Sequence, residues 1–394
     1  MLEWRQMESP FRRLLRRKRP GTGDFSSRID DYLPGNALTL LATGKDTYDA
    51  MWAAIDAAKE TIHLETYILR GDKTGQEFSR RLQAKARAGV RVRLIFDSIG
   101  SLDLDPAFIT QMRNSGVQFL EYHPLAPWRP RWSWWLRDHR KALIVDGKIA
   151  FTGGANICDD HAPVESGGGG WHDIHVRLEG PAAHELDRVF RALWFKETRR
   201  WFQLEEPAGP KGSSKVWVVA NQEFIYRYRI RAAYLDALKA ARKEVLIANA
   251  YFVPDLRTRL ALAAAARRGV SVKVLVPGKS DVQSVWYAGR YEYEYLLRRG
   301  VKLYEWQGPM LHAKCAVVDG EWATVGSYNM DHRSLLSNLE VNFNVVDRAF
   351  GATMASQLTA DMGRSREIVL EIWKKRPYAD KVIERFFWSF SAFF

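Results

Sequence analysis

The sequence predicts an α/β fold built from two similar halves. Short apolar segments rich in β-branched residues, with glycine or aspartate at their ends, alternate with longer helical stretches. These segments recur in the same order in the two halves of the 394-residue chain. Because strands this apolar are usually buried on both faces, we expect in each half a mixed sheet covered by helices.

The repeat consists of five pairs of matching segments. In order along the chain, the pairs are KETIHLETYIL (59–69) and KEVLIANAYFV (243–253), RAGVRVRLIFD (87–97) and RRGVSVKVLVP (267–277), SGVQFLEY (115–122) and RGVKLYEW (299–306), DHRKALIVDGKIAFTGGAN (138–156) and LHAKCAVVDGEWATVGSYN (311–329), and HDIHVRLEG (172–180) and EVNFNVVD (340–347). Chance explains five matches in one order poorly, so each half is expected to be one copy of a repeated unit.

A segment rich in proline, glycine and serine, EEPAGPKGSS at 205–214, is typical of a linker between the two copies. We therefore place the first half at 35–204 and the second at 215–365. A basic N-terminal arm at 1–34 and an aromatic C-terminal tail at 366–394 lie outside the repeat.

Composition limits the partners that the chain can have. The formal net charge is +13 and the pI about 9.6, which indicates a polyanionic partner, either nucleic acid or an anionic membrane. The 15 tryptophans favour the membrane, because tryptophan prefers the water–lipid interface. No apolar run reaches the roughly 18 residues that cross a bilayer, and the N-terminus lacks a secretory signal. We expect neither a transmembrane helix nor export.

Each half carries one copy of the motif H-x-K-x4-D. The copies are His139, Lys141 and Asp146, and His312, Lys314 and Asp319. Because residues i and i+2 of a strand share a face, the histidine and lysine of each copy project together. Each aspartate falls on the opposite strand parity and begins an Asp-Gly turn, so we interpret both aspartates as structural.

The Asp-Gly turn folds the next strand back and brings a Gly-x-Asn segment beside each His-Lys pair. The asparagines, Asn156 and Asn329, lie at the same interval from their histidines. Two lysines, two asparagines and two histidines suit the oxygens of a phosphate. Reaction at phosphorus without a metal needs a nucleophile, a positive cradle and an acid, which these side chains supply. One motif alone would be weak evidence, but two in register are strong evidence.

An acidic residue follows each motif, Asp173 in the first half and Glu340 in the second. Each can accept a hydrogen bond from an imidazole Nδ1–H and so direct Nε2 at phosphorus; the alternative is a surface carboxylate at a strand start. The sequence leaves open which acid pairs with which histidine. It shows no carboxylate cluster of the kind Mg²⁺ or Ca²⁺ needs, and Cys158 and Cys315 have no metal-ligand spacing. We therefore expect no metal and no cofactor, with both cysteines buried in a reducing compartment.

With these motifs the sequence resembles the phospholipase D superfamily, and most of all the shorter bacterial cardiolipin synthases, over residues 36–365. Four further stretches carry the resemblance and favour lipid-handling members over nucleases. They are HLETYIL with Glu65 and Tyr67, FDSIGS with Asp97, NAYFVPD with Tyr251 and Pro254, and SYNMDHRSLLSNLEVNF with Asp331, Arg333, Ser334, Asn338 and Glu340. Longer cardiolipin synthases carry an N-terminal transmembrane hairpin, which this sequence does not show.

The resemblance implies two fused phospholipase D-like repeats in a pseudo-twofold bilobal fold, and a covalent phosphohistidine formed without metal. It implies that phosphatidylglycerol donates a phosphatidyl group to a glycerol-type hydroxyl, that of a second phosphatidylglycerol. Substrate contacts are assigned by the resemblance to Glu65, Tyr67, Tyr251 and Arg333. The alternatives are a phospholipase D-type hydrolase, a metal-independent nuclease and an inactive phosphate-binding scaffold.

The expected partners are an anionic phospholipid membrane and phosphatidylglycerol, whereas nucleic acid is not favoured and no protein partner is predicted. The expected location is peripheral, on the cytoplasmic face of the bacterial inner membrane. The basic stretch from Arg12 to Arg19 within the N-terminal arm can dock on anionic lipid or remain a solubilising segment. The tail has apolar residues at helical spacing, which suits an interfacial helix or a terminal helix that caps the core. They are Ile383, Phe386, Phe387, Phe390, Phe393 and Phe394.

The first half carries an extra segment before its histidine that the second half lacks. It contains four tryptophans, Trp128, Trp132, Trp134 and Trp135. Its position before His139 suggests a lip at which lipid enters the site; a packed loop is the alternative. A glycine-rich stretch, SGGGG at 166–170, is expected to form a mobile loop near the site.

Overall fold

The computed structural model describes residues 31–129, 131–221 and 226–393. The basic stretch from Arg12 to Arg19 and the last residue, Phe394, therefore lie outside the described residues. Within the part that is described, no helix combines the length and the apolarity needed to cross a membrane.

One continuous sheet of 16 strands runs through the molecule. The strands from the first half are β1 (Leu33–Leu41), β2 (Thr61–Thr66), β3 (Arg91–Asp97), β4 (Gln118–Tyr122), β5 (Arg137–Asp138), β6 (Ala142–Val145), β7 (Ile149–Gly153) and β8 (His175–Glu179). Those from the second half are β9 (Ser214–Asn221), β10 (Glu244–Asn249), β11 (Ser271–Pro277), β12 (Lys302–Trp306), β13 (Lys314–Val318), β14 (Trp322–Gly326), β15 (Asn338–Val346) and β16 (Ser365–Glu367).

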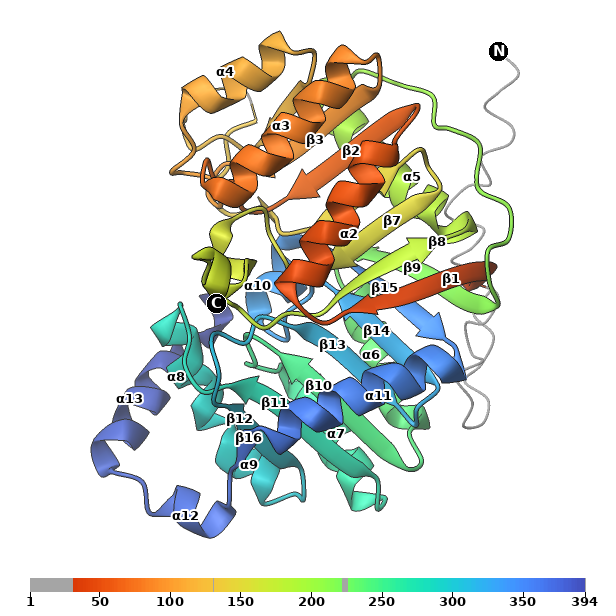
Figure 1. Cartoon of the computed structure of the whole chain (residues 1–394). Coiled ribbons are helices and arrows are strands. Elements are labelled where there is room, and N and C mark those ends of the chain that lie inside the picture. Colours follow the sequence, from red (N-terminus) through yellow and green to blue (C-terminus); the bar gives the residue numbers. More distant parts are fainter. Residues whose placement is uncertain (1–30, 130, 222–225, 394) are drawn as a thin grey trace.

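The strand order shows the repeat directly. The first half runs β1-β8-β7-β6-β2-β3-β4 and the second runs β9-β15-β14-β13-β10-β11-β12-β16. In each half the three strands β2-β3-β4 or β10-β11-β12 are parallel and their neighbours are antiparallel. The strands of the two halves form one sheet because β1 pairs antiparallel with β9 (Figure 1). The prediction of two α/β repeats with mixed sheets is confirmed.

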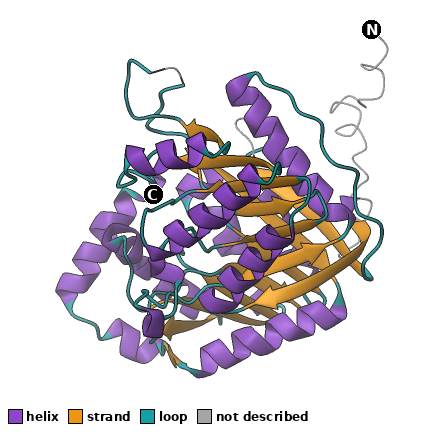
Figure 2. Ribbon diagram, turned by 45° about the horizontal axis from the view of Figure 1, so that its top comes forward, coloured by secondary structure: helices purple, strands orange, loops and turns teal. Residues whose placement is uncertain are grey.

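Helices cover both faces of the sheet (Figure 2). In the first half they are α2 (Gly44–Ala57), α3 (Lys73–Arg87), α4 (Pro106–Asn114), α5 (Pro181–Thr198), η3 (Asp159–His161) and η4 (Val164–Ser166). In the second half they are α6 (Arg229–Ala240), α7 (Leu256–Arg267), α8 (Gln283–Tyr291), α9 (Tyr293–Leu297), α10 (His332–Leu336), α11 (Arg348–Gly363), α12 (Leu370–Lys374), α13 (Tyr378–Ser389) and η5 (Ser391–Phe393).

The hydrophobic core of the described residues has three large clusters and a small fourth one formed by Val253, Val285 and Ala288. One lies under α2 and α3 of the first half, and a second lies under α6 and α7 of the second half. The third is shared, because Phe190 of α5 and Met354 of α11 belong to one buried cluster together with strands of both halves. The halves are thus joined by a common core as well as by the β1–β9 pair, and their relative position is held by buried apolar surface.

Asp146 and Asp319 have equivalent positions in the two halves. Each begins the turn between the paired strands of its motif, with a positive φ of 52° and 54° respectively. The Asp146 carboxylate accepts hydrogen bonds from three backbone N–H groups at 59–61, and Asp319 accepts three at 242–244. Each aspartate therefore ties its hairpin to the start of a neighbouring strand, far from the histidine, in line with the structural role predicted for it.

The boundaries differ slightly from those that we expected. Strand β1 begins at Leu33, inside the segment assigned to the arm, and the linker ends where β9 begins at Ser214. Strand β16 begins at the end of the second half and continues into the tail, where it pairs with β12. The tail therefore begins as part of the sheet.

Candidate active site

Both histidines lie at the seam between the halves, and each is held by backbone from the other half. The His139 N–H donates to Leu339 O at 3.0 Å, and the His312 N–H donates to His172 O at 2.7 Å. Leu339 and His172 immediately precede the two acidic residues, Glu340 and Asp173. This exchange brings the acid of one half beside the histidine of the other.

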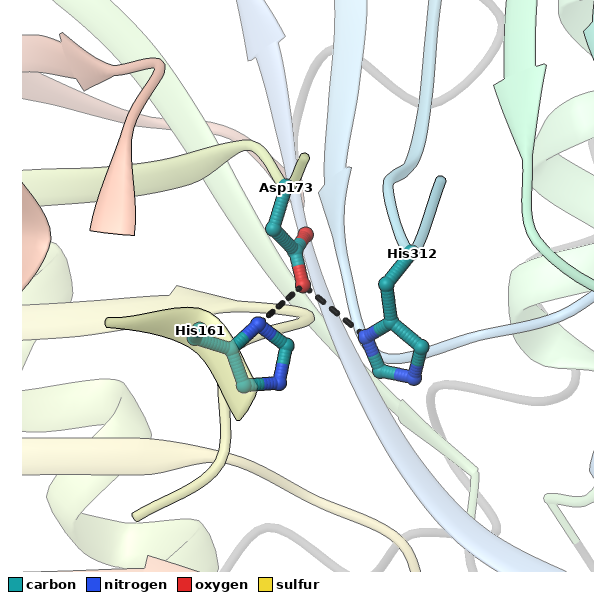
Figure 3. Close-up of side chains that lie close together, drawn as sticks. All are labelled: His161, Asp173 and His312. Carbon is teal, nitrogen blue, oxygen red and sulfur yellow. Dashed lines mark hydrogen bonds and ion pairs between the residues drawn. The ribbon is translucent and has the colours of Figure 1, made fainter. Parts of the chain in front are cut away.

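The side chains follow the same crossed arrangement. His139 Nδ1 lies 3.0 Å from Glu340, and His312 Nδ1 lies 2.9 Å from Asp173 (Figure 3). Each imidazole thus donates its Nδ1–H to a carboxylate and keeps Nε2 for a reaction. The pairing that the sequence left open is therefore His139 with Glu340 and His312 with Asp173.

Each lysine of the two motifs contacts the backbone of its own histidine. Lys141 Nζ donates to His139 O at 2.7 Å, and Lys314 Nζ donates to His312 O. Both lysines are fully buried, so their ammonium groups are poorly solvated. Burial lowers the pKa of Lys141 to about 7 and that of Lys314 to about 8. A phosphate anion between them would restore their charge, because an opposite charge favours the protonated form.

The same burial acts on the histidines and on Glu340. Desolvation lowers the pKa of His139 and of His312 well below the usual range, and the nearby lysines lower both further. Burial also raises the pKa of Glu340 to about 7. Burial and the nearby lysines thus favour neutral imidazoles at both histidines when no substrate is bound.

The carboxylates of the two acids are supported differently. Glu340 accepts hydrogen bonds from the hydroxyls of Ser327 and Ser334, the latter at 2.7 Å, and from Asn338 at 3.4 Å. Asp173 instead packs against Gly154, the counterpart of Ser327, where an added Cβ would lie 2.4 Å from both carboxylate oxygens. The shorter acid faces glycine and the longer acid faces serine, so the two half-sites are matched in space but not in chemistry.

The two asparagines are buried beside the motifs. The Asn156 side-chain oxygen accepts from the Ile68 N–H at 3.2 Å, and its backbone oxygen accepts from the Tyr48 hydroxyl at 2.8 Å. The Asn329 N–H lies 3.3 Å from Ser334 Oγ, and its side-chain oxygen has no hydrogen-bond partner. Each asparagine follows the second strand of its motif, after β7 or β14, and its contact with phosphate stays a prediction.

Of the four residues assigned to substrate, the two tyrosines flank the histidines. The Tyr67 ring lies edge-on to His139 at 5.1 Å between centroids, and the Tyr251 ring lies edge-on to His312 at 6.4 Å. Each ring also lies within 6 Å of its lysine ammonium, at 5.2 Å for Lys141 and 5.9 Å for Lys314. Tyr251 is anchored through its hydroxyl, which donates to Asp281.

Arg333 and Glu65 lie in different surroundings. Arg333 is half-buried on α10, and its positive charge contributes to the lowered pKa of His139. Glu65 is fully buried and its Oε1 lies 3.5 Å from Arg140. A contact between Glu65 and lipid is not supported by this position, because the carboxylate faces a buried network and not open space.

A family model described as "Cardiolipin synthase, PLD-like domain" matches residues 51–194 and 234–365, one segment in each half. The chain belongs to this family.

Two curated relatives of the family support the assignment over most of the chain. The "Cardiolipin synthase" of Geobacillus kaustophilus is 33% identical over 352 residues, covering 88% of this chain and 70% of that protein. The "Cardiolipin synthase B" of Escherichia coli K12 is 38% identical over 339 residues, covering 82% of this chain and 80% of that protein.

Solved structures support the fold alone. A phosphatidylserine synthase from Haemophilus influenzae aligns with a TM-score of 0.71 at 13% identity, covering 94% of this chain and 98% of that chain. A polyphosphate kinase from Porphyromonas gingivalis aligns with a TM-score of 0.59 at 15% identity, covering 90% and 53%. The family model and the curated relatives confirm the resemblance to the phospholipase D superfamily.

Sequence reasoning missed Arg140, the residue between His139 and Lys141. It is fully buried, and it donates to Asn221 O at 2.9 Å and to Glu340 O at 3.4 Å, so it links the two halves of this cardiolipin synthase-family chain. Arg140 lies between β5 and β6, directly before a strand whose residues are all buried. A charged residue at that position needs buried partners.

His161 was also missed. It ends η3 and its Nδ1 lies 3.6 Å from Asp173 Oδ2, beyond hydrogen-bond distance. His161, Asp173 and His312 have their ligand atoms within 4.8 Å of one another. The expectation that no metal-ligand set accompanies the histidines is therefore wrong, because these three side chains lie close enough together to bind one ion. The reason is that His161 and His312 are neighbours only after the two halves dock.

The surroundings of the site agree in part with the sequence. The tryptophan segment is exposed, with Trp128 85% and Trp134 60% accessible, so it is not a packed loop. Helix α13 has two faces, because Phe387 stacks on Tyr287 while Phe386 is 57% exposed. One face of the helix therefore packs on the protein, as expected for a terminal helix that caps the core, while contact of the other face with a membrane stays a prediction. The short helix η5 beyond it contacts α10.

The glycine-rich loop at 166–170 is tied down by its backbone. The N–H groups of Gly168, Gly169 and Gly170 donate to Pro163, Asp159 and Ala162. The expected mobile loop is here a hydrogen-bonded turn that leads to Trp171, whose ring lies 5.3 Å from His312.

Proposed function

We propose that the chain is a cardiolipin synthase-like phosphatidyltransferase that forms a phosphohistidine with phosphatidylglycerol as donor. The observation that carries the proposal is the crossed pair of histidines, each fixed through Nδ1 by a carboxylate and flanked by a buried lysine. Two such imidazoles provide a nucleophile and an acid at one phosphodiester.

In the first step, Nε2 of His139 attacks phosphorus while the P–O bond to glycerol breaks. The leaving glycerol oxygen takes a proton from His312, and the phosphatidyl group is then bonded to His139. In the second step a hydroxyl oxygen of another phosphatidylglycerol bonds to phosphorus while the P–N bond to His139 breaks, and the hydroxyl proton goes to His312. The products are cardiolipin and glycerol, and the enzyme returns to its first state. Added glycerol should therefore drive the reaction backward.

The assignment of His139 as nucleophile is supported by its surroundings. Its partner Glu340 has a pKa raised to about 7 by burial, so near neutral pH this carboxyl group is often protonated. A neutral Glu340 cannot stabilise a protonated His139. The positive charge of Arg333 disfavours a protonated His139 as well. A nucleophile must be neutral, and these neighbours keep it so. His312, paired with Asp173, is then the acid.

Transfer to an alcohol competes with water at about 55 M. Effective molarities of 10⁵ M or more are reached when the acceptor is held in place, which is enough to overcome that excess. Tyr67 and Tyr251 at the two histidines, and the exposed tryptophans before His139, are the features that would exclude water and admit lipid.

We place the enzyme as a peripheral membrane protein on the cytoplasmic face of the bacterial inner membrane, with an anionic phospholipid surface as its partner. The net charge of +13 and the exposed aromatic residues of the tryptophan segment and of α13 support this location.

The test is product analysis with phosphatidylglycerol vesicles, in buffer with EDTA, for the wild type and for His139→Ala and His312→Ala. Cardiolipin and glycerol should form with the wild type alone. Phosphatidic acid as the dominant product would make the protein a hydrolase, and DNA cleavage without lipid turnover would make it a nuclease. Complete loss of activity in EDTA, restored by one divalent ion, would contradict the metal-independent mechanism.

A further inference from the structure

His161 is a buried imidazole without an evident role in phosphodiester transfer. Its side chain is fully buried, and neither ring nitrogen has a hydrogen-bond partner. Its ring lies edge-on to His312, 5.1 Å away between centroids. Burying a polar group without partners costs free energy, so a histidine here needs an explanation beyond packing.

The unpartnered ring faces a carboxylate that is already in the site. Figure 3 shows that His161 and His312 both direct Nδ1 at one oxygen of Asp173, which lies between them. Among the described residues, this is the one group of three or more His, Cys, Asp or Glu whose ligand atoms lie within 4.8 Å of one another. Two imidazoles and a carboxylate are a ligand set typical of Zn²⁺ and related borderline cations.

The separations suit a tetrahedral ion. With metal–ligand bonds of about 2.0–2.1 Å, ligand atoms around Zn²⁺ lie about 3.4 Å apart. Asp173 Oδ2 is 3.6 Å from His161 Nδ1 and 2.9 Å from His312 Nδ1, one slightly above and one slightly below that value. A shift of about 0.5 Å would open the second pair, with water as the fourth ligand.

The second half-site offers no such set within the described residues. Ser334 follows Asn329 at the same interval as His161 follows Asn156, and its hydroxyl donates to Glu340 at 2.7 Å. Where the second half supports its acid with a serine, the first half has an imidazole at non-bonding distance. The difference supplies a third metal ligand to one histidine and not to the other.

We propose that His161, Asp173 and His312 form a binding site for a borderline divalent cation such as Zn²⁺, and that occupancy switches the enzyme off. A metal bond to Nδ1 of His312 moves the remaining ring proton to Nε2. That nitrogen can then neither attack phosphorus nor accept the proton of the incoming alcohol. Turnover therefore stops if His312 is the nucleophile, and it also stops if His312 is the acid, because that acid must act as the base in the second step. The inhibition rests on the proposed function, whereas the cation site does not.

The test uses the full chain with Co²⁺ as a spectroscopic probe. Wild type should show the visible absorption of tetrahedral Co²⁺, and Zn²⁺ should displace it. The key variant is His161→Ser, which copies the second half-site, and His184→Ser removes an imidazole from α5 as a control. Removing a ligand should weaken binding by at least about 10-fold, since even outer-shell changes cost that much.

Activity is measured in parallel on phosphatidylglycerol vesicles, with each variant compared with its own rate in EDTA. Zn²⁺ should inhibit the wild type and His184→Ser reversibly, and inhibit His161→Ser at concentrations at least about 10-fold higher. Binding of Co²⁺ without any transferase activity would sink the proposed function and leave the cation site standing.

Three results would overturn the cation site. The first is the absence of a Co²⁺ spectrum, together with no rise in Tm on adding Zn²⁺ to the wild type. The second is equal affinity in His161→Ser and wild type. The third is an X-ray absorption spectrum of the zinc-loaded wild type that shows fewer than two imidazoles in the coordination shell. If His161→Ser does not fold, His161→Asn replaces it in the affinity measurement.

Discussion

The two half-sites have the same geometry but differ in how each carboxylate is held. Glu340 lies within a set of hydroxyls and an amide, and its pKa is raised to about 7. Asp173 lies against a glycine and accepts from the Ile174 N–H at 2.7 Å. A reaction that needs one neutral and one protonated imidazole at the same moment needs such a difference. Duplication supplied two equivalent histidines, and the residues around their acids make them inequivalent.

The largest effect should come from removing either histidine. His139→Ala and His312→Ala should each lower the rate of cardiolipin formation by about 10⁴-fold or more, as expected for residues that act as a unit. A phosphodiester with a p-nitrophenol leaving group separates the roles, because that group departs without an acid. With this substrate, His312→Ala should still release a burst of nitrophenol and carry an adduct on His139, seen by mass spectrometry. An adduct on His312 in the wild type would reverse the assignment.

The next effect compares the two acids. Asp173→Asn should lower kcat by about 10³-fold or more, because the variant cannot stabilise a protonated His312. Glu340→Gln should cost less, about 10-fold, since Glu340 has a pKa near 7 and the amide resembles its neutral form. Steady-state kinetics on vesicles measures both. Equal losses would show that the two half-sites do not differ in charge.

The pH dependence follows from the lysines. Lys141 with a pKa of about 7 and Lys314 with a pKa of about 8 carry their charge below these values and lose it above them. The charged forms bind phosphate, so kcat/KM should fall as pH rises from about 7 to about 9. The profile of kcat, which reports the complex, should fall at higher pH. Identical alkaline limbs for kcat and kcat/KM would contradict this account.

The smallest effect concerns binding to the membrane surface. Flotation with vesicles should require anionic lipid and weaken with salt, because exposed charges are screened beyond about 8 Å at physiological ionic strength. Phe386→Ser with Phe390→Ser should reduce binding, since Phe386 on α13 and Phe390 directly after it are both exposed. Deleting residues 1–20 should also reduce it. Equal binding to neutral and anionic vesicles would show that charge is not the attraction.

Much of this site could be predicted because it depends on local periodicity. The repeated motif identified both His-Lys pairs, and the Asp-Gly turn indicated a structural role for Asp146. The strand that was expected to hold both His139 and Lys141 is absent, because residues 139–141 lie between β5 and β6. The pairing of acids could not be predicted, because it depends on how β5 lies beside β15, a contact between residues about 200 positions apart. His161 escaped for the same reason, since its neighbours arrive from the other half.

The reliance of each histidine on the other half has a consequence during synthesis. When a ribosome has made only the first half, His139 already exists but lacks the strand and the carboxylate that orient it. A nascent chain that ends after the first half would therefore have no complete half-site, and the same holds for a fragment that contains one half alone. On the proposed function, phosphatidyl transfer would begin only after translation has finished and the two halves have docked.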